Sequence, residues 1–304
     1  MSARSQAHVF TGPRPVLMAI VGPGGARAAA LAVQGGADLV QVRAKELTSR
    51  ELLALVRDVI AEVGRADVVL VNSRPDIAVL TGAGVSAESG VPTFRDAQTG
   101  YWAQFRPEDM ATEAGFRAHP RRVWDWYQHR RNLLAGVHPN AGHVALAQFQ
   151  QQHPGRLTLI TQNVDGLHQR AGSIGTLCLH GDIFADRWLD TPRNCCHIDH
   201  AVAGHPPYCD RCGNLVRPGV VWFGEPLPYA TLEAAQQAAR TCELMLVVGT
   251  AGAVYPAAGL AQVARQAGAR VVIINPAASD LDDVAHALLS GTAASVLPAL
   301  LAGV

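Results

Sequence analysis

Four short apolar runs constrain the fold of this chain more than any other feature. They read IAVL, LTLIT, LMLVVGT and VVIIN, at residues 77–80, 157–161, 244–250 and 271–275. A run that is apolar at successive positions suits a strand that is buried on both faces, so these runs favour parallel strands covered by helices. The chain from residue 77 onward is therefore predicted to form an α/β domain with a Rossmann-like parallel sheet.

The segment before residue 77 has an alternating pattern of its own. Strand-like runs at 16–21, 39–43 and 68–72 are separated by two helix-like stretches. This β-α-β-α-β order predicts parallel strands joined by right-handed crossovers. We therefore predict two parts, residues 1–76 and residues 77–304.

Two modules are expected as insertions in the second part. An aromatic, helical stretch occupies about 100–150, and an irregular segment at 178–212 holds five of the six cysteines. Six cysteines in 304 residues do not make a disulfide framework. We therefore expect a reducing, cytoplasmic location.

Composition and charge exclude several classes of protein. Hydrophobic residues make up 49% and charged residues 16%, which is typical of a globular domain. The 25 basic and 25 acidic residues cancel, so we expect neither a nucleic-acid partner nor binding to an anionic membrane surface. No apolar run approaches the roughly 20 residues of a membrane span. The apolar run at 16–21 is also too short for a signal peptide. The pattern leaves the oligomeric state open.

A glycine-rich loop, TGAGVSAESG at 81–90, directly follows the first apolar run. Gly82, Gly84 and Ala87 match the dinucleotide fingerprint, in which backbone N–H groups and a helix N-terminus face a phosphate. A simple turn is the alternative interpretation of so short a motif. A dehydrogenase would also carry an acidic residue about 20 positions later to hold the ribose. Residues 100–106 read GYWAQFR instead, which argues against hydride transfer.

Several further motifs follow the loop. They read TQNVDGLHQRAG, LHGDIF, RPGVVWFGE and VVGTAGAVYPAA, at 161–172, 179–184, 217–225 and 247–258. Together with GAGVSAESGVPTFR and the terminal IIN of the last run, they resemble the sirtuin family, the NAD-dependent protein-lysine deacylases, over about residues 77–304. The resemblance implies transfer of the acyl group from acylated lysine side chains of proteins to ADP-ribose, with release of nicotinamide.

The resemblance also implies roles for individual residues. His180 would be the general base, because an imidazole titrates near neutral pH. Asn163 and Asp165 would lie in the nicotinamide pocket, and Val221 and Phe223 would meet the peptide along an extended edge. The expected NAD contacts are Gly82, Ala83, Gly84, Ser86, Phe94, Arg95, Gln162, Asn163, Asp165, Gly249, Thr250 and Asn275.

Two other functions use the same NAD site. One is transfer of ADP-ribose to protein, and the other is a non-catalytic sensor of NAD or ADP-ribose. The set of His180, Asn163 and Asp165 argues against the sensor, because binding alone needs no base.

Tyr127 and Arg130 suggest which acyl group is removed. On a helix, residues three apart share a face, so the phenol and the guanidinium would point the same way. Such a pair suits a carboxylate. This stretch resembles sirtuins that remove succinyl or malonyl groups. The alternative is an ordinary amphipathic helix with solvated arginines.

The cysteines suggest a structural zinc site. Cys209 and Cys212 have the C-x-x-C spacing of one half of such a site. For the other half we expect Cys196 and His200, because two adjacent thiolates seldom both bind one tetrahedral metal. Loss of the zinc is the alternative.

Residues 1–76 resemble the opening third of thiamine-phosphate synthase, a (β/α) barrel enzyme. Gln41, Arg43, Lys45 and Asn72 match substrate-binding positions of that family. A barrel of this kind needs eight strands, from roughly 200 residues or more. We therefore expect a partial barrel-like segment without thiamine-synthesising activity.

Overall fold

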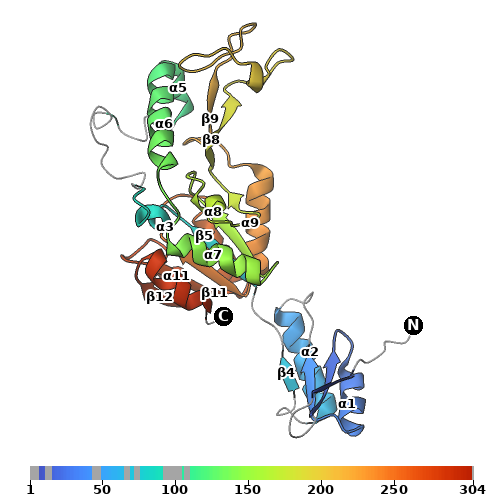
Figure 1. Cartoon of the computed structure of the whole chain (residues 1–304). Coiled ribbons are helices and arrows are strands. Elements are labelled where there is room, and N and C mark those ends of the chain that lie inside the picture. Colours follow the sequence, from blue (N-terminus) through green and yellow to red (C-terminus); the bar gives the residue numbers. More distant parts are fainter. Residues whose placement is uncertain are drawn as a thin grey trace. The chain divides into compact units, whose positions relative to one another are not determined.

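The chain divides into two units, residues 1–75 and 76–304, beside the predicted boundary (Figure 1). The computed structural model describes residues 7–10, 16–42, 49–64, 69–71, 76–91, 105 and 110–302. Five residues of predicted function lie outside this part: Phe94, Arg95, Arg43, Lys45 and Asn72.

The first unit contains a four-stranded sheet in the order β1-β2-β3-β4. Three of its strands are parallel, as the alternating pattern predicts: β2 (Val16–Val21), β3 (Leu39–Val42) and β4 (Val69–Val71). Two helices connect them, α1 (Ala26–Gln34) and α2 (Ser49–Val63). The pattern did not reveal β1 (Ala7–Phe10), which pairs antiparallel with β2. The resemblance of this unit to thiamine-phosphate synthase stays a prediction.

The second unit is built on a parallel sheet of six strands. The sheet has the order β12-β11-β10-β5-β6-β7. Its strands are β5 (Ile77–Thr81), β6 (Leu157–Thr161), β7 (Leu177–Cys178), β10 (Leu244–Val248), β11 (Arg270–Asn275) and β12 (Ala287–Ser290). This is the Rossmann arrangement that the four apolar runs predict. Because the chain leaves β5 in one direction and returns to β10 on its other side, the topological switch point lies between β5 and β10.

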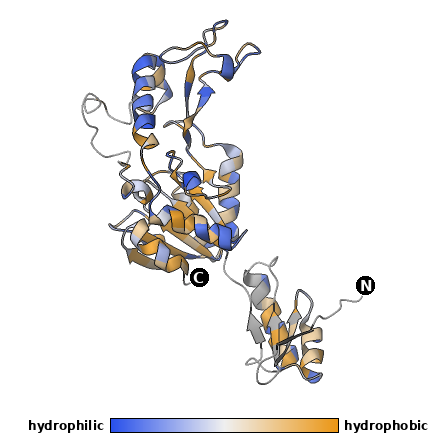
Figure 2. Cartoon of the chain, in the orientation of Figure 1, coloured by the Kyte–Doolittle hydropathy of each residue, from blue (hydrophilic) through white to orange (hydrophobic). Residues whose placement is uncertain are grey.

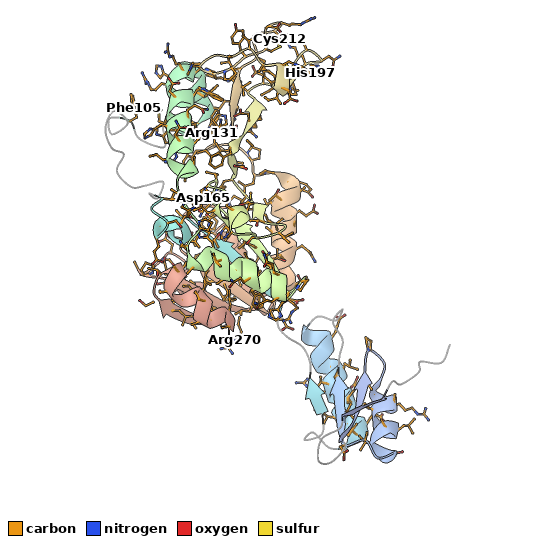
Figure 3. The ribbon with its side chains drawn as sticks, in the orientation of Figure 1. Phe105, Arg131, Asp165, His197, Cys212 and Arg270 are labelled. Atoms are coloured by element: carbon orange, nitrogen blue, oxygen red, sulfur yellow. The ribbon has the colours of Figure 1, made fainter. Side chains whose placement is uncertain are left out.

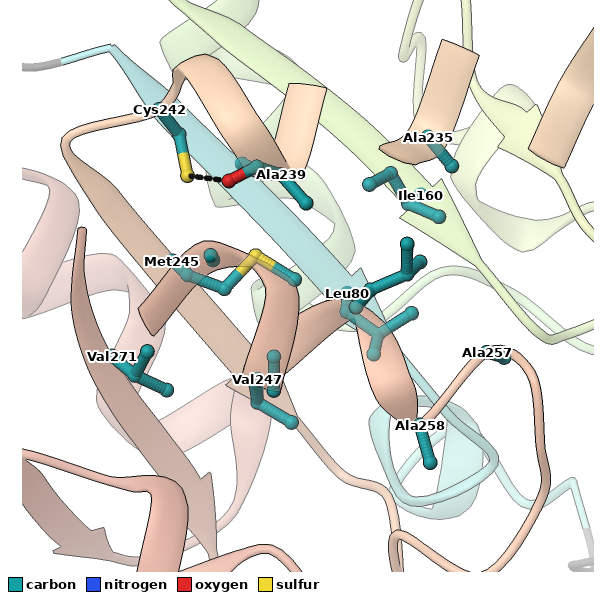
Figure 4. Close-up of a cluster of buried hydrophobic side chains, with 14 of the residues drawn as sticks. Leu80, Ile160, Ala235, Ala239, Cys242, Met245, Val247, Ala257, Ala258 and Val271 are labelled. Carbon is teal, nitrogen blue, oxygen red and sulfur yellow. Dashed lines mark hydrogen bonds between the residues drawn. The ribbon is translucent and has the colours of Figure 1, made fainter. Parts of the chain in front are cut away.

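Helices cover both faces of this sheet (Figure 1). Helices α7 (Ala141–Gln152) and α11 (Ala293–Ala302) pack on the face to which Ile77 and Val79 point. Helices α9 (Tyr229–Thr241) and α10 (Gly259–Gln266) pack on the face of Ala78 and Leu80 (Figure 4). The alternation explains why the strands are apolar at successive positions, and Figure 2 shows hydrophobic residues concentrated in them. None of the described helices combines the length and apolarity that crossing a membrane requires.

A smaller module stands beside the carboxyl edge of the sheet. It contains α5 (Glu113–Ala118), α6 (Pro120–Ala135) and an antiparallel pair, β8 (Gly181–Trp188) and β9 (Val216–Val220). Its own core includes Phe116, Trp126, Ile183 and Trp222. The short elements α3 (Gly84–Ala87), α8 (Leu167–Arg170), η3 (Ile198–His200) and η4 (Asp282–Val284) complete the unit.

The loops after β5 and β10 touch at their glycines. A Cβ added to Gly84 would lie 2.8 Å from the Cα of Gly249, and one added to Gly82 would lie 2.7 Å from the Cβ of Thr250. Gly249 also has a φ of +62°, a conformation that side chains rarely tolerate. The N–H of Gly84 donates to the Gly249 carbonyl at 2.8 Å. Glycine is therefore required at these positions because the two backbones approach each other so closely.

We predict that Gly84→Ala destabilises the second unit by about 1–3 kcal/mol, because a backbone has to move to admit the methyl group. Urea unfolding gives this value. The control is Gly136→Ala at the end of α6, where the nearest neighbour of an added Cβ lies 4.0 Å away. Equal stability of the two variants would contradict the packing argument.

Candidate active site

A cavity of about 850 Å³ lies in the second unit, at the carboxyl edge of the sheet. Its size is within the usual range for small-molecule sites, roughly 300–1,000 Å³. It brings together residues from the loops after β5, β6 and β10, from α6 and from the segment after β9. The predicted residues that line it are Gly82, Ala83, Gly84, Ser86, Tyr127, Arg130, Gln162, Asn163, Asp165, His180, Val221, Phe223, Gly249, Thr250 and Asn275.

His180 lies between β7 and β8, where both its backbone and its ring are fixed. Its carbonyl accepts the N–H of Val221 at 2.8 Å, and its Nδ1 lies 2.9 Å from the carbonyl oxygen of Gln162. Because a carbonyl can only accept, Nδ1 carries the hydrogen and Nε2 keeps its lone pair. Burial lowers the pKa of His180 below its ordinary 6.5, against the opposing effect of the Gln162 carbonyl. The ring is therefore neutral and basic at neutral pH.

Asn163 and Asp165 meet at the side chain of Ser86. The Ser86 hydroxyl donates to Asp165 Oδ2 at 2.7 Å and accepts from Asn163 Nδ2 at 3.2 Å. Asn163 Nδ2 also donates to the Gly82 carbonyl at 3.1 Å, and the N–H of Leu167 donates to Asp165 Oδ1 at 2.9 Å. The predicted polar pair is thus held in a fixed position against the glycine-rich loop. Figure 3 labels Asp165 between the sheet and the smaller module that carries Arg131 and Cys212.

The other predicted NAD contacts lie at the neighbouring strand ends. Gln162 Nε2 donates to the hydroxyl of Thr250 at 3.3 Å, and Asn275 Nδ2 donates to the Thr250 carbonyl at 3.4 Å. The strand ends β6, β10 and β11 are therefore tied to one another across the switch point. This edge is where open α/β sheets bind dinucleotides. The position, size and polar lining of the cavity fit NAD.

Tyr127 and Arg130 line one part of the cavity from α6. The indole N–H of Trp222 donates to the Tyr127 hydroxyl at 2.9 Å, so the Tyr127 hydrogen can point to another acceptor. Burial raises the pKa of Tyr127 to about 12, so it remains a donor. Burial also lowers the pKa of Arg130, and Tyr127 and Asp165 oppose this. In the described part of the chain, no carboxylate lies within ion-pair distance of Arg130.

Trp222, which the sequence motifs did not single out, is held from its other face by a buried arginine. The guanidinium carbon of Arg217 lies 3.2 Å from the centroid of the indole ring. Arg217 pairs with Glu225, whose Oε2 also accepts the backbone N–H of Trp222 at 2.8 Å. Burial would raise the pKa of Glu225, but the hydrogen bonds from Arg217 and Trp222 lower it. An arginine and a glutamate therefore fix the partner of Tyr127.

The extended edge predicted at 219–225 is only partly available. The N–H groups of Val221 and Phe223 already donate to the carbonyls of His180 and Ala111. Both side chains line the cavity, and Phe223 is 50% exposed. A peptide strand that adds here would have to pair with backbone groups other than these two N–H groups.

Four cysteines form a cluster in the loops between β8 and β9. The sulfur atoms of Cys195, Cys196, Cys209 and Cys212 all lie within 4.8 Å of one another. Tetrahedral zinc with bonds of about 2.3 Å places its sulfur ligands about 3.8 Å apart, so this set fits the metal. The structure places Cys195, and not the predicted His200, in this cluster beside Cys196. Cys195 lies in a turn, where adjacent side chains do not alternate between faces as in a strand, and both neighbouring thiols can join the cluster.

The parallel sheet and the polar cavity at its switch point are those of a dinucleotide-binding protein. The Sir2 family model matches residues 82–256. An NAD-dependent protein deacylase of Ralstonia nicotianae is 56% identical over 226 residues, which cover 74% of this chain and 91% of that protein. The solved complex of a Sir2 homologue with NAD is 41% identical with a TM-score of 0.67, and covers 75% of this chain and 88% of its own.

A second solved structure, of Sir2 bound to an acetylated peptide, is 27% identical with a TM-score of 0.65. The match covers 84% of this chain and 98% of that chain. The chain therefore belongs to the Sir2 family, and it is an enzyme of the NAD-dependent protein deacylase class. The resemblance of its motifs to sirtuins is confirmed.

We predict that the purified protein binds one zinc ion per chain and that a Cys195→Ser/Cys212→Ser variant loses it. The control is His200→Ala, which should keep the metal because the imidazole is outside the thiol cluster. Elemental analysis by mass spectrometry measures the zinc content. Loss of zinc from the His200 variant together with its retention by the cysteine variant would contradict this ligand set.

Proposed function

We propose that this enzyme removes acyl groups from protein lysines with NAD as co-substrate, and that it favours acyl groups that end in a carboxylate, such as succinyl and malonyl. The observation that carries the proposal is the pairing, in one cavity, of a neutral base with an arginine that lacks a carboxylate partner in the described chain. The base supports deacylation, and the arginine supports the acyl preference. The relatives named as deacylases and the peptide-bound Sir2 structure support lysine acyl groups of proteins as substrates.

When bound, NAD supplies an electrophilic ribose carbon whose leaving group is nicotinamide. The chain's part is to hold the groups around that carbon and to exclude water. Asn163 and Asp165, fixed through Ser86, offer amide and carboxylate groups on one wall of the cavity. On this wall a carboxylate can stabilise positive charge that develops at the ribose.

His180 is suited to remove a proton from a ribose hydroxyl. Its Nδ1–H is engaged by the Gln162 carbonyl, so its Nε2 is the atom that accepts the proton. The Gln162 carbonyl would also stabilise the imidazolium that forms. A base with a lowered pKa stays neutral over the whole neutral range, which keeps it active there.

Arg130 and Tyr127 are suited to meet an acyl carboxylate. Removing a carboxylate from water is costly unless a charged, hydrogen-bonding partner replaces the water. Arg130 supplies charge, and the hydrogen of the Tyr127 hydroxyl is directed away from Trp222. The charge of Asp165 raises the pKa of Arg130, but the Asp165 carboxylate already accepts hydrogen bonds from Ser86 and Leu167. The guanidinium therefore keeps donors for a ligand.

We predict that kcat/KM for NAD falls at acidic pH with an apparent pKa below 6.5, because burial lowers the pKa of His180 and only the neutral ring can accept a proton. Rates are measured from pH 5 to 9 at saturating acyl-peptide. His180→Ala should lower turnover by roughly 10²–10⁴-fold, and its remaining activity should lack this acid limb. An acid limb centred well above 6.5 would contradict the buried, neutral base.

We predict that Arg130→Met lowers kcat/KM for a succinylated peptide by about 10- to 100-fold relative to an acetylated one, since hydrogen bonds to charged groups are worth about 1.5–3 kcal/mol. An acetyl group has no carboxylate for the arginine to meet. The control is Arg121→Met on the same helix, whose side chain is 80% exposed. An unchanged ratio of the two efficiencies in Arg130→Met would overturn the acyl preference and leave deacylation itself standing.

A further inference from the structure

A chain of hydrogen bonds connects the N-terminus of α7 to the active-site carboxylate. Asn140 is the N-cap of this helix, and its backbone N–H donates to Nδ1 of His143 at 3.3 Å. On the other side of the ring, His143 Nε2 lies 3.3 Å from the Ser86 hydroxyl. Ser86 in turn donates to Asp165 at 2.7 Å. His143 itself does not line the cavity, and it is fully buried.

The direction of every bond in this chain can be assigned. A backbone N–H can only donate, so Nδ1 of His143 accepts and the ring hydrogen resides on Nε2. The Ser86 oxygen then receives two hydrogens, one from His143 and one from Asn163. Its own hydrogen has to point to Asp165. A helix cap thereby fixes the orientation of a hydroxyl in the active site.

The surroundings of His143 maintain this single arrangement. Burial lowers its pKa to about 4, against the opposing charge of Asp165, so the ring stays neutral and carries one hydrogen. The ring of His168, also buried, lies 4.8 Å away and limits its rotation. The Asn140 side chain donates to the Val85 carbonyl at 2.8 Å and to the Ser89 hydroxyl at 3.0 Å. The cap therefore holds the glycine-rich loop at two further points.

We propose that His143 is a positioning residue for catalysis: by donating from Nε2 to Ser86 it directs the Ser86 hydroxyl to Asp165 and holds the Asp165–Asn163 wall in its working geometry. This inference rests on the proposed deacylation. It assigns a function to a residue whose other visible role is to cap α7. The two roles use different ring nitrogens, so substitution can separate them.

Two conservative variants provide the separation. In His143→Asn the side-chain oxygen falls near the place of Nδ1 and can still accept the Asn140 N–H, but the side chain no longer reaches Ser86. In His143→Gln the terminal amide falls near the place of Nε2 and can donate to Ser86, but the acceptor for Asn140 is lost. Each variant of the full chain is characterised by its melting temperature, by kcat and KM for NAD and for an acetylated peptide, and by ADP-ribose affinity.

The proposal predicts that His143→Asn lowers kcat by about 10-fold, and that His143→Gln stays within about 3-fold of the wild type even if it melts earlier. KM for the peptide and ADP-ribose affinity should change less than about 2-fold, because the affected wall faces the nicotinamide side. A purely structural role predicts that activity follows melting temperature in both variants, and this result would overturn the proposal.

A double-mutant cycle with Ser86→Ala adds an independent criterion. If His143 acts through Ser86, His143→Asn should have little further effect on kcat once the hydroxyl is absent. Fully additive losses would overturn the proposed route. Should His143→Asn fail to fold, the glutamine variant decides: near-normal kcat supports the proposal, and a 10-fold loss contradicts it. A wild-type protein without turnover would overturn the proposed function, and this inference with it.

Discussion

The contact between the loops after β5 and β10 is the constraint on which the rest of the site depends. Gly84 and Gly249 approach so closely that neither admits a Cβ without movement of backbone. This contact joins the loops after β5 and β10 at the switch point, and both glycines line the cavity. Ser86 and Thr250 lie in these two loops. Gln162 and Asn163, in the loop after β6, are hydrogen-bonded to them.

Around this contact, hydrogen bonds to buried polar groups orient the side chains that line the cavity. His180 is oriented by a carbonyl of the neighbouring loop, Asp165 by Ser86, and Tyr127 by Trp222. Such networks are stable only when their members are satisfied, and they then specify one arrangement. Arg130 differs, because it has no carboxylate partner among the described residues. This difference is the basis of the proposed role of Arg130 in binding an acyl carboxylate.

The sequence predicted local elements better than contacts between distant ones. The four central strands of the sheet and the gathering of the motif residues follow from apolar runs that end in polar loops, whereas the edge strands β7 and β12 were not predicted. By contrast, β1 is a four-residue strand without a strong pattern. The link from His143 to Ser86 joins residues 57 positions apart. The capping box that Asn140 and His143 form at α7 was not among the predicted features, and neither was its connection to the glycine-rich loop. Cys195 was excluded by a rule for adjacent thiolates that a turn does not obey.

Product analysis distinguishes the candidate functions, because deacylation, ADP-ribosyl transfer and passive NAD binding leave different molecules. The full chain is incubated with NAD and a peptide carrying acetyl- or succinyl-lysine, and all products are identified by mass spectrometry. A deacylase of this class is expected to yield nicotinamide, free-lysine peptide and O-acyl-ADP-ribose in equal amounts. ADP-ribose attached to peptide or protein while the acyl-lysine stays intact would contradict it.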